Sequence, residues 1–306
     1  MRPLASVRSS AQVSPLPGHL ALLGQTLIIC GGYVVGREAA QKFDPLLLTG
    51  LRAWGSALVY LLLWPLLRKT SSAPLTWREM PAPWKKRLVI LAVLGIFFNQ
   101  LLFNWGLRYT TAATTALIYA LTPSVVFWLG VWVFHREQVQ RRRVIALALA
   151  YGGVVLALWH NLLHSQNGWG WLLILGAVGF WGWYLNYSPP VVNRLGPIAV
   201  TAYIMGLGAL LHTPTLIAGL SRQEWKALGP ASWLSLAYLI LGMSVLAYLL
   251  LSVGLKYLSP TQTALYINLQ PIGTTALAAL LGQEPLSWQL FVAALLTTGG
   301  MLLFQR

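Results

Sequence analysis

Long apolar runs alternate with short polar segments along almost the whole chain. Each run is close to the roughly 20 apolar residues that a helix needs to cross a lipid bilayer. Several predicted helices begin at a proline, whose missing N–H is tolerated at a first helical position. The pattern predicts an all-α membrane protein with ten transmembrane helices, at 19–41, 46–66, 88–107, 111–133, 143–161, 168–187, 197–218, 233–256, 260–281 and 287–304.

The composition supports a membrane environment. Of 306 residues, 57% are hydrophobic and 9% are charged, against about 25% charged in ordinary soluble domains. Six acidic residues are too few to cover a water-soluble protein of this length. The net charge of +15 comes from basic residues in short loops, which is typical of membrane proteins and argues against a nucleic-acid partner.

The distribution of Lys and Arg predicts the orientation. With residues 1–18 as a cytoplasmic tail, 15 basic residues fall in inside segments and 5 in outside loops, and Arg52 lies within a span. Cytoplasmic loops carry the excess of positive charge, so both termini are expected in the cytoplasm, with a bacterial inner membrane as the expected location.

An internal repeat divides the chain into halves, expected at 19–161 and 168–304. Residues 107–123 (LRYTTAATTALIYALTP) and 255–271 (LKYLSPTQTALYINLQP) are identical at seven of 17 positions. Glu137 and Glu284 match further on, as do the glycine pairs 152–153 and 299–300. Five spans is an odd number, so the second half must be inverted relative to the first. Inverted repeats are typical of secondary transporters that work by alternating access, although duplicated helices can also simply enlarge a bundle.

The doubled pattern LRYT–P–E–GG resembles the EamA-type transporters of the drug/metabolite transporter superfamily. Arg52, in DPLLLTGLRAW, also matches a position where that family commonly carries an arginine. The first glutamate motif departs from the family pattern and reads His135-Arg136-Glu137. The resemblance implies a ten-helix transporter, with a cavity lined by spans 1, 3, 4, 6, 8 and 9.

Polar and aromatic residues near the middle of the spans are the candidates for this substrate cavity. Those at 115, 119 and 122 share one helix face, as do those at 262, 266 and 270 on the repeat-related span. Each can instead form a hydrogen bond between helices, worth about 0.6 kcal/mol. The full predicted set is Tyr33, Asn99, Thr115, Tyr119, Thr122, Trp181, Tyr248, Gln262, Tyr266 and Gln270.

Prolines and charges within or beside the spans have two interpretations each. Pro123 and Pro271 interrupt helical hydrogen bonding at equivalent depth, as hinges or as plain kinks. Arg52 could bind an anionic substrate, but its place near a helix start favours a structural role, reaching the outer headgroups or pairing with Glu38 or Asp44. Glu137 and Glu284 are expected to cap or orient the next helix.

The sequence predicts no enzyme, cofactor or metal site, because no nucleophile with its base and no HExxH motif is present. No carboxylate occupies the centre of a span, which favours uncoupled or weakly coupled movement of neutral, zwitterionic or aromatic small metabolites, with efflux as the expected direction. A non-transporting receptor or assembly factor is the alternative. The glycine pairs could pack helices within the chain or form a homodimer.

Overall fold

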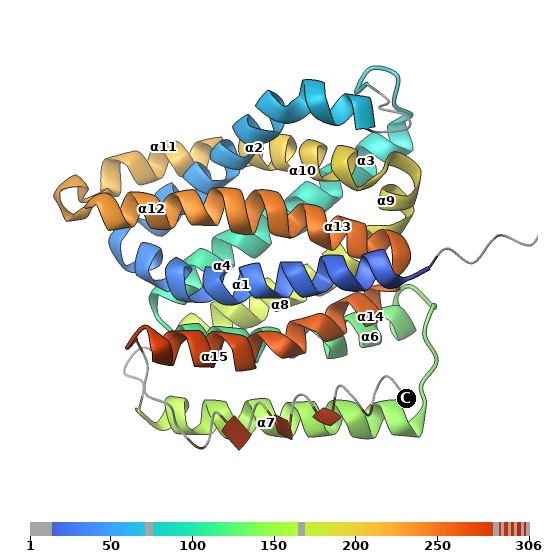
Figure 1. Cartoon of the computed structure of the whole chain (residues 1–306), viewed down its shortest axis with the longest axis vertical. Helices are drawn as coiled ribbons and strands as arrows, with labels where there is room; N and C mark the ends of the chain where they lie inside the picture. The colour runs from blue at the N-terminus through green and yellow to red at the C-terminus, as the bar shows by residue number, and fades with distance from the viewer. Residues whose placement is uncertain are drawn as a thin grey trace, which may run out of the picture.

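A computed structural model describes residues 14–70, 76–164 and 169–283, and residues 288, 291–292, 295–296, 299–300 and 303 near the end of the chain. Within these residues every regular element is a helix, and most helices run along one common direction, horizontal in Figure 1. In the first half the helices are α1 (Leu16–Lys42), α2 (Pro45–Thr70), α3 (Ala82–Leu91), η1 (Ala92–Phe98), α4 (Asn99–Arg108), α5 (Ala112–Tyr119), α6 (Thr122–Trp132) and α7 (Arg141–His164).

The second half follows the same order. Its helices are α8 (Trp169–Tyr187), α9 (Pro189–Leu195), α10 (Pro197–Leu211), α11 (Thr213–Arg222), η2 (Trp225–Ala227), α12 (Pro230–Tyr238), η3 (Leu239–Leu246), α13 (Ala247–Tyr257), α14 (Pro260–Leu265), η4 (Tyr266–Leu269) and α15 (Gln270–Leu280).

By length and composition, five described helices could cross a membrane, or six if the bent pair α9 and α10 counts as one. The five are Leu16–Lys42, Pro45–Pro65, Ala82–Arg108, Ala112–Trp132 and Pro230–Tyr257. The segment from α14 to α15 is not among them, since Gln262, Asn268 and Gln270 make it less apolar. Ten spans therefore stay a prediction.

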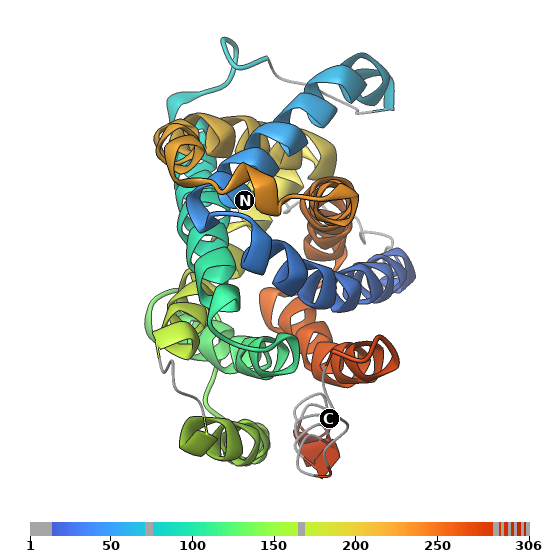
Figure 2. The ribbon, with the colours of Figure 1, turned by 90° about the vertical axis from the view of Figure 1, so that its left-hand side faces the viewer.

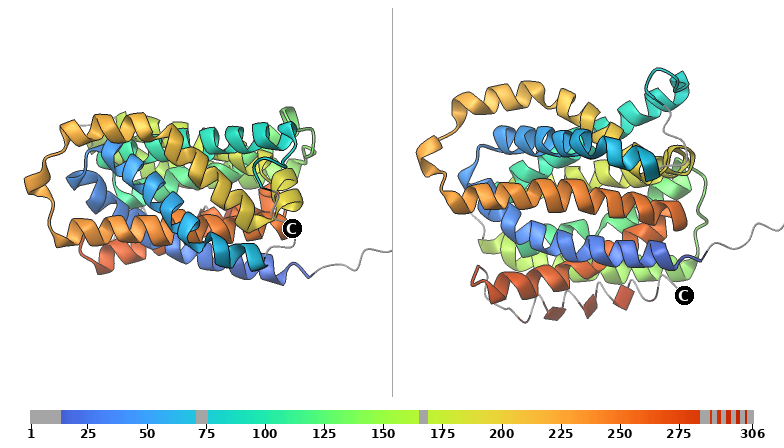
Figure 3. Two further views of the ribbon diagram at one scale, coloured as in Figure 1. Left: turned by 90° about the horizontal axis from the view of Figure 1, so that it is seen from above. Right: turned by 45° about the horizontal axis from the view of Figure 1, so that its top comes forward.

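The two halves are interleaved rather than packed as separate units. Helix α1 packs against α13 and α15, whereas α8 packs against α4 and α6. Helix α2 packs against α10, its counterpart in the other half, and α5 packs against α15. In Figures 1 and 2, α7 lies at one end of the molecule, beyond this central bundle, and Figure 3 shows the bundle from two further directions. The first helix of each half thus lies against helices from the third and fourth predicted spans of the other half.

Both halves contain a π-helical segment at the same place in the repeat, η1 and η3. A π-helix changes the register of backbone hydrogen bonds, which leaves carbonyl groups available to side chains. The Tyr60 hydroxyl donates to the carbonyl of Val245 in η3 (2.8 Å), and Nε2 of His212 lies 3.1 Å from the carbonyl oxygen of Ile96 in η1. A side chain from the other half therefore holds each π segment.

The spans that contain Pro123 and Pro271 are broken helices. Helix α5 ends at Tyr119 and α6 begins at Thr122, while a 3₁₀ turn, η4, separates α14 from α15. Pro123 and Pro271 each lie within the first two residues of the helix that follows the break. The hydroxyl of Thr122 donates to the Tyr119 carbonyl (2.6 Å), four residues before Pro123, where proline supplies no amide donor. The backbone is therefore interrupted at equivalent points in both halves.

Candidate functional site

A cavity lies at the centre of the bundle, between the two halves. Its volume is about 50 Å³, which is room for a few water molecules and less than a metabolite needs. Side chains from α1, α2, α4 and α5 line it from the first half, and side chains from α8, η3, α13, α14, η4 and α15 line it from the second. Both halves thus contribute to one central site.

The structure places six of the ten predicted cavity residues around this cavity: Tyr33, Asn99, Tyr119, Trp181, Tyr248 and Gln270. Hydrogen bonds connect several of them. The Tyr33 hydroxyl donates to Oε1 of Gln270 (2.9 Å), which joins α1 to α15. Nδ2 of Asn99 donates to the Tyr119 hydroxyl (2.8 Å), which joins α4 to α5. Their contact with a substrate remains a prediction.

One hydrogen bond joins residues at equivalent positions of the two halves. Gln100 and Tyr248 are 148 residues apart, the separation of the repeat, and Nε2 of Gln100 lies 3.5 Å from the Tyr248 hydroxyl. That hydroxyl also donates to the carbonyl of Gly95 in η1 (2.8 Å). The centre of the cavity is therefore linked directly to a π-helical segment.

Four predicted cavity residues lie elsewhere. Thr115 and Thr122 are buried but donate to backbone carbonyls of their own segments, at Thr111 and Tyr119. Gln262 is exposed and forms a capping box with Ser259 at the start of α14. Tyr266 is partly buried and its hydroxyl contacts the ring of His19. A shared helix face did not separate these environments: Thr115 and Tyr119 lie four residues apart on α5, yet only Tyr119 lines the cavity.

Arg52 lies in the interior of the bundle rather than at its surface, where the sequence predicted it. Its side chain is 1% exposed and lines the central cavity. One terminal nitrogen donates to Oδ1 of Asn104 (2.8 Å), the other to the Ser244 hydroxyl (3.3 Å), and Nε has no partner. Asp44 instead caps the start of α2, accepting from the amide of Leu46 (2.9 Å). Arg52 thus points into the bundle because Asn104 and Ser244 offer it oxygens there.

Several further cavity residues fell outside the predicted set. Gln25, Ile29 and Tyr33 follow one another at four-residue intervals along α1, so a helical-face argument extended from Tyr33 would have found the first two. Phe103 and Thr263 also line the cavity. An apolar Phe in a membrane span carries no signal that separates cavity lining from packing.

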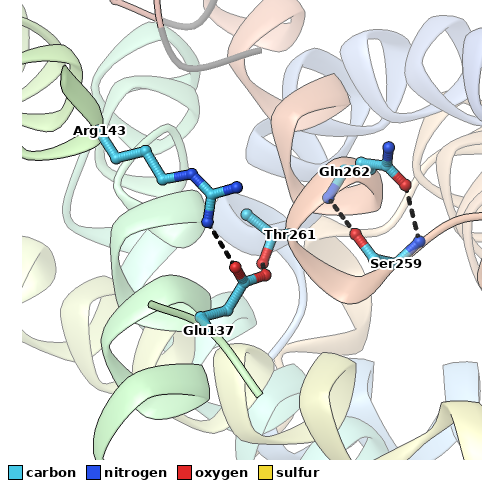
Figure 4. Close-up of polar contacts among 5 residues, drawn as sticks. All are labelled: Glu137, Arg143, Ser259, Thr261 and Gln262. Atoms are coloured by element: carbon cyan, nitrogen blue, oxygen red, sulfur yellow. Dashed lines mark hydrogen bonds and ion pairs between the residues drawn. The ribbon is translucent and has the colours of Figure 1, made fainter. Parts of the chain in front are cut away.

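Glu137 joins the two halves near one end of the bundle. Its carboxylate accepts from Arg143 at the start of α7 (2.6 Å) and from the Thr261 hydroxyl in α14 (2.7 Å), as Figure 4 shows. The contact with Arg143 joins Glu137 to the next helix, and a role of Glu137 in orienting that helix stays a prediction. The contact with Thr261 was not expected, and it comes from the other half. Glu284, its counterpart, lies outside the described residues.

We expect Glu137→Gln to lower the apparent melting temperature of the purified protein. The amide loses the ion pair with Arg143 and weakens the bond from Thr261. Hydrogen bonds to charged groups contribute about 1.5–3 kcal/mol, and partial exposure of this pair places the loss near the lower value. Glu224→Gln, at an exposed position, is the matched control and should leave the temperature unchanged. Equal melting temperatures for both variants would contradict the role of Glu137.

Within the part of the chain that the structure describes, no three His, Cys, Asp or Glu side chains come together as a metal site would require. The polar groups of the cavity include amides, hydroxyls, an indole N–H and one guanidinium. Such groups can bind and orient a small molecule through hydrogen bonds and one positive charge.

Comparison with known proteins shows similarity to transporters. The uncharacterized transporter YetK of Bacillus subtilis (strain 168) is 22% identical over 92% of this chain and 85% of its own length. The uncharacterized inner membrane transporter YedA of Escherichia coli (strain K12) is 25% identical over 90% of this chain and 86% of its own. An S-adenosylmethionine/S-adenosylhomocysteine transporter of Chlamydia trachomatis is 25% identical over 59% of this chain and 57% of its own.

A structural comparison and a family match point the same way as these sequence similarities. A solved crystal structure superposes with a TM-score of 0.70 over 94% of this chain and 95% of the other, at 19% sequence identity, which shows a shared fold. The EamA-like transporter family matches residues 16–159 and again residues 168–305. The chain therefore belongs to the EamA-like transporter family and is a multi-pass helical membrane protein that carries the family's domain twice.

Proposed function

We propose that the protein is a secondary transporter that moves small metabolites through the central cavity by alternating access. The observation that carries the proposal is the cavity itself, which is lined by polar and aromatic side chains from both halves. A small relative movement of the halves would change its size and its access, because each half supplies one side of it. Its small volume fits a contracted form that must widen to admit a substrate.

The proposal includes ten spans arranged as two inverted five-helix repeats. The exchanged packing supports this, since α1 lies against α13 and α15 as α8 lies against α4 and α6. Equivalent π segments and equivalent breaks before Pro123 and Pro271 support it further. Cytoplasmic termini follow from the 15 to 5 distribution of basic residues. The relative YedA, named an inner membrane transporter, supports a bacterial inner membrane.

Amino acids and similar zwitterionic, neutral or aromatic metabolites are the proposed substrates, with efflux as the direction. Tyr33, Tyr119, Trp181 and Tyr248 offer aromatic surfaces to the cavity, and Asn99 offers an amide. A relative named as a transporter of S-adenosylmethionine and S-adenosylhomocysteine supports small organic molecules as cargo. The homodimer suggested by the glycine pairs belongs to the same proposal, and Gly152 and Gly299 are exposed on their helices.

Flux through proteoliposomes tests the proposed function. Purified protein is reconstituted and loaded in turn with radiolabelled amino acids, nucleosides and aromatic amines, and both uptake and exchange are followed. We expect at least one compound to move faster than through protein-free liposomes, and the rate to fall in Gln270→Leu, which loses the bond from Tyr33. No flux of any compound in either direction would contradict transport and favour a receptor or assembly factor on the same scaffold.

A further inference from the structure

The central cavity holds a buried positive charge that meets no counter-ion among the described residues. The Arg52 side chain is 1% exposed, yet only two of the five N–H donors of its guanidinium are bonded, to Asn104 and Ser244. Both partners are neutral. Nε is buried and has no partner. A buried cation with neutral partners alone is costly, and such a group inside a membrane protein usually marks a functional site.

No acidic side chain compensates Arg52 within the described part of the chain. The cavity is lined by no Asp or Glu. The five acidic residues that the structure describes have other places: Glu38 and Glu224 are exposed, Asp44 caps α2, Glu79 bonds Thr76, and Glu137 contacts Arg143 and Thr261. A negative charge brought by a ligand would supply the missing partner.

The surroundings select the kind of anion. Of the described residues that line the cavity, only Arg52 is a Lys, Arg or His. One guanidinium balances the single charge of a carboxylate, whereas a phosphate group carries closer to two negative charges at neutral pH. The hydroxyl of Thr263 lines the same cavity and is likewise without a partner, so it is a second available donor. Tyr119, Trp181 and Phe103 provide an apolar wall for the rest of the ligand.

We propose that Arg52 binds the carboxylate of the transported metabolite, so that the substrates are monocarboxylates, including zwitterionic amino acids, rather than amines, amides or phosphate esters. This inference rests on the proposed transport function and narrows its substrate class. Asn104 and Ser244 hold the guanidinium toward the cavity and leave Nε for the ligand. The carboxylate therefore occupies the side of the cavity next to α2.

A thermal-unfolding comparison of benzoate with benzamide tests this site. The two probes have the same ring and nearly the same shape, but only benzoate is charged. At constant ionic strength set with chloride, benzoate should raise the melting temperature of the purified full chain in a concentration-dependent way, and benzamide should not. Arg52→Gln should abolish the benzoate response, and Arg222→Gln, at an exposed position on α11, should keep it.

Equal shifts with both probes, no shift with benzoate, or a benzoate shift retained in Arg52→Gln would each overturn the proposal. If Arg52→Gln does not fold, Arg52→Lys serves instead: the shift with benzoate should be weaker than in the natural chain, because Lys lacks Nε and the planar fork of a guanidinium, and an unchanged shift would overturn the proposal. Flux tells the two proposals apart. Movement of amines or amides alone would overturn the carboxylate site and leave transport standing. A benzoate shift without flux of any compound would overturn transport and leave the carboxylate site standing.

Discussion

Replacement of both Pro123 and Pro271 by alanine is expected to slow transport at least about tenfold without destabilising the protein. Each proline lies just after a break in its span, and neither supplies an amide donor to the preceding turn. Alanine restores that donor and removes a penalty of up to about 3 kcal/mol against a continuous helix. Since about 1.4 kcal/mol changes an equilibrium tenfold, straightened helices would favour one conformation strongly. Proteoliposome exchange rates and melting temperatures measure the two effects.

Pro45→Ala is the matched control for this experiment. Pro45 is the first residue of α2, where no intrahelical amide bond is needed, so its replacement should change neither rate nor stability appreciably. Each single variant should give an intermediate rate, because one half keeps its break. Normal exchange in the double variant would contradict the hinge hypothesis and leave the prolines as plain kinks.

A second large effect is expected for Gly219→Ala in α11. A Cβ atom there would lie 2.3 Å from the backbone nitrogen of Leu47 in α2, and 2.6 Å from its Cα atom. Backbone atoms cannot turn away as a side chain can, so α11 must move off α2. Such overpacking costs about 1–3 kcal/mol. The apparent melting temperature in lipid nanodiscs should fall accordingly.

Gly206→Ala provides the opposite case. Gly206 lies inside α10, and a Cβ atom there would meet nothing within 4 Å. Alanine is favoured over glycine in a helix interior by up to about 1 kcal/mol, so this variant should be as stable as the natural chain or slightly more stable. If both variants melt at the same temperature, the close packing of α11 on α2 does not contribute as we expect.

The sequence was most informative where a feature occurs twice. The repeat at 107–123 and 255–271 led to the family, which matches both halves of the chain. Tyr33 and Trp181 occupy equivalent positions on the first helix of each half, and both line the cavity. Polar and aromatic residues in the middle of spans stand out against an apolar background, which is why Asn99, Tyr248 and Gln270 could be predicted.

Other features depend on backbone register, which the sequence does not display. The π-helical segments η1 and η3 consist of ordinary apolar residues, AVLGIFF and LILGMSVL. They are evident from backbone bonds that span five residues, such as that from the Asn99 amide to the Leu94 carbonyl, and side chains such as Tyr60 and His212 bond their carbonyls. The exposed position of Gln262 follows from its place in the capping box of α14. This helix is short, whereas the periodicity predicted one continuous helix over 260–281.

Arg52 shows how a distance along the chain can mislead. It follows Pro45 by seven residues, about 10 Å along a helix, which is close enough for a long side chain to reach the membrane surface. The structure turns it inward, because Asn104 from α4 and Ser244 from η3 meet it in the core. Only the packing of three helices that are distant in sequence brings these residues together.

The most direct test of the central claim is the accessibility of the cavity from the two sides of the membrane. A single cysteine replaces Gln100, which lines the cavity, in a chain whose natural Cys30 is changed to serine. A membrane-impermeant thiol reagent is then applied to sealed right-side-out and inside-out vesicles. Alternating access predicts labelling from both sides, with a rate that substrate changes in opposite directions on the two sides. Labelling from one side only, unaffected by any transported compound, would contradict it.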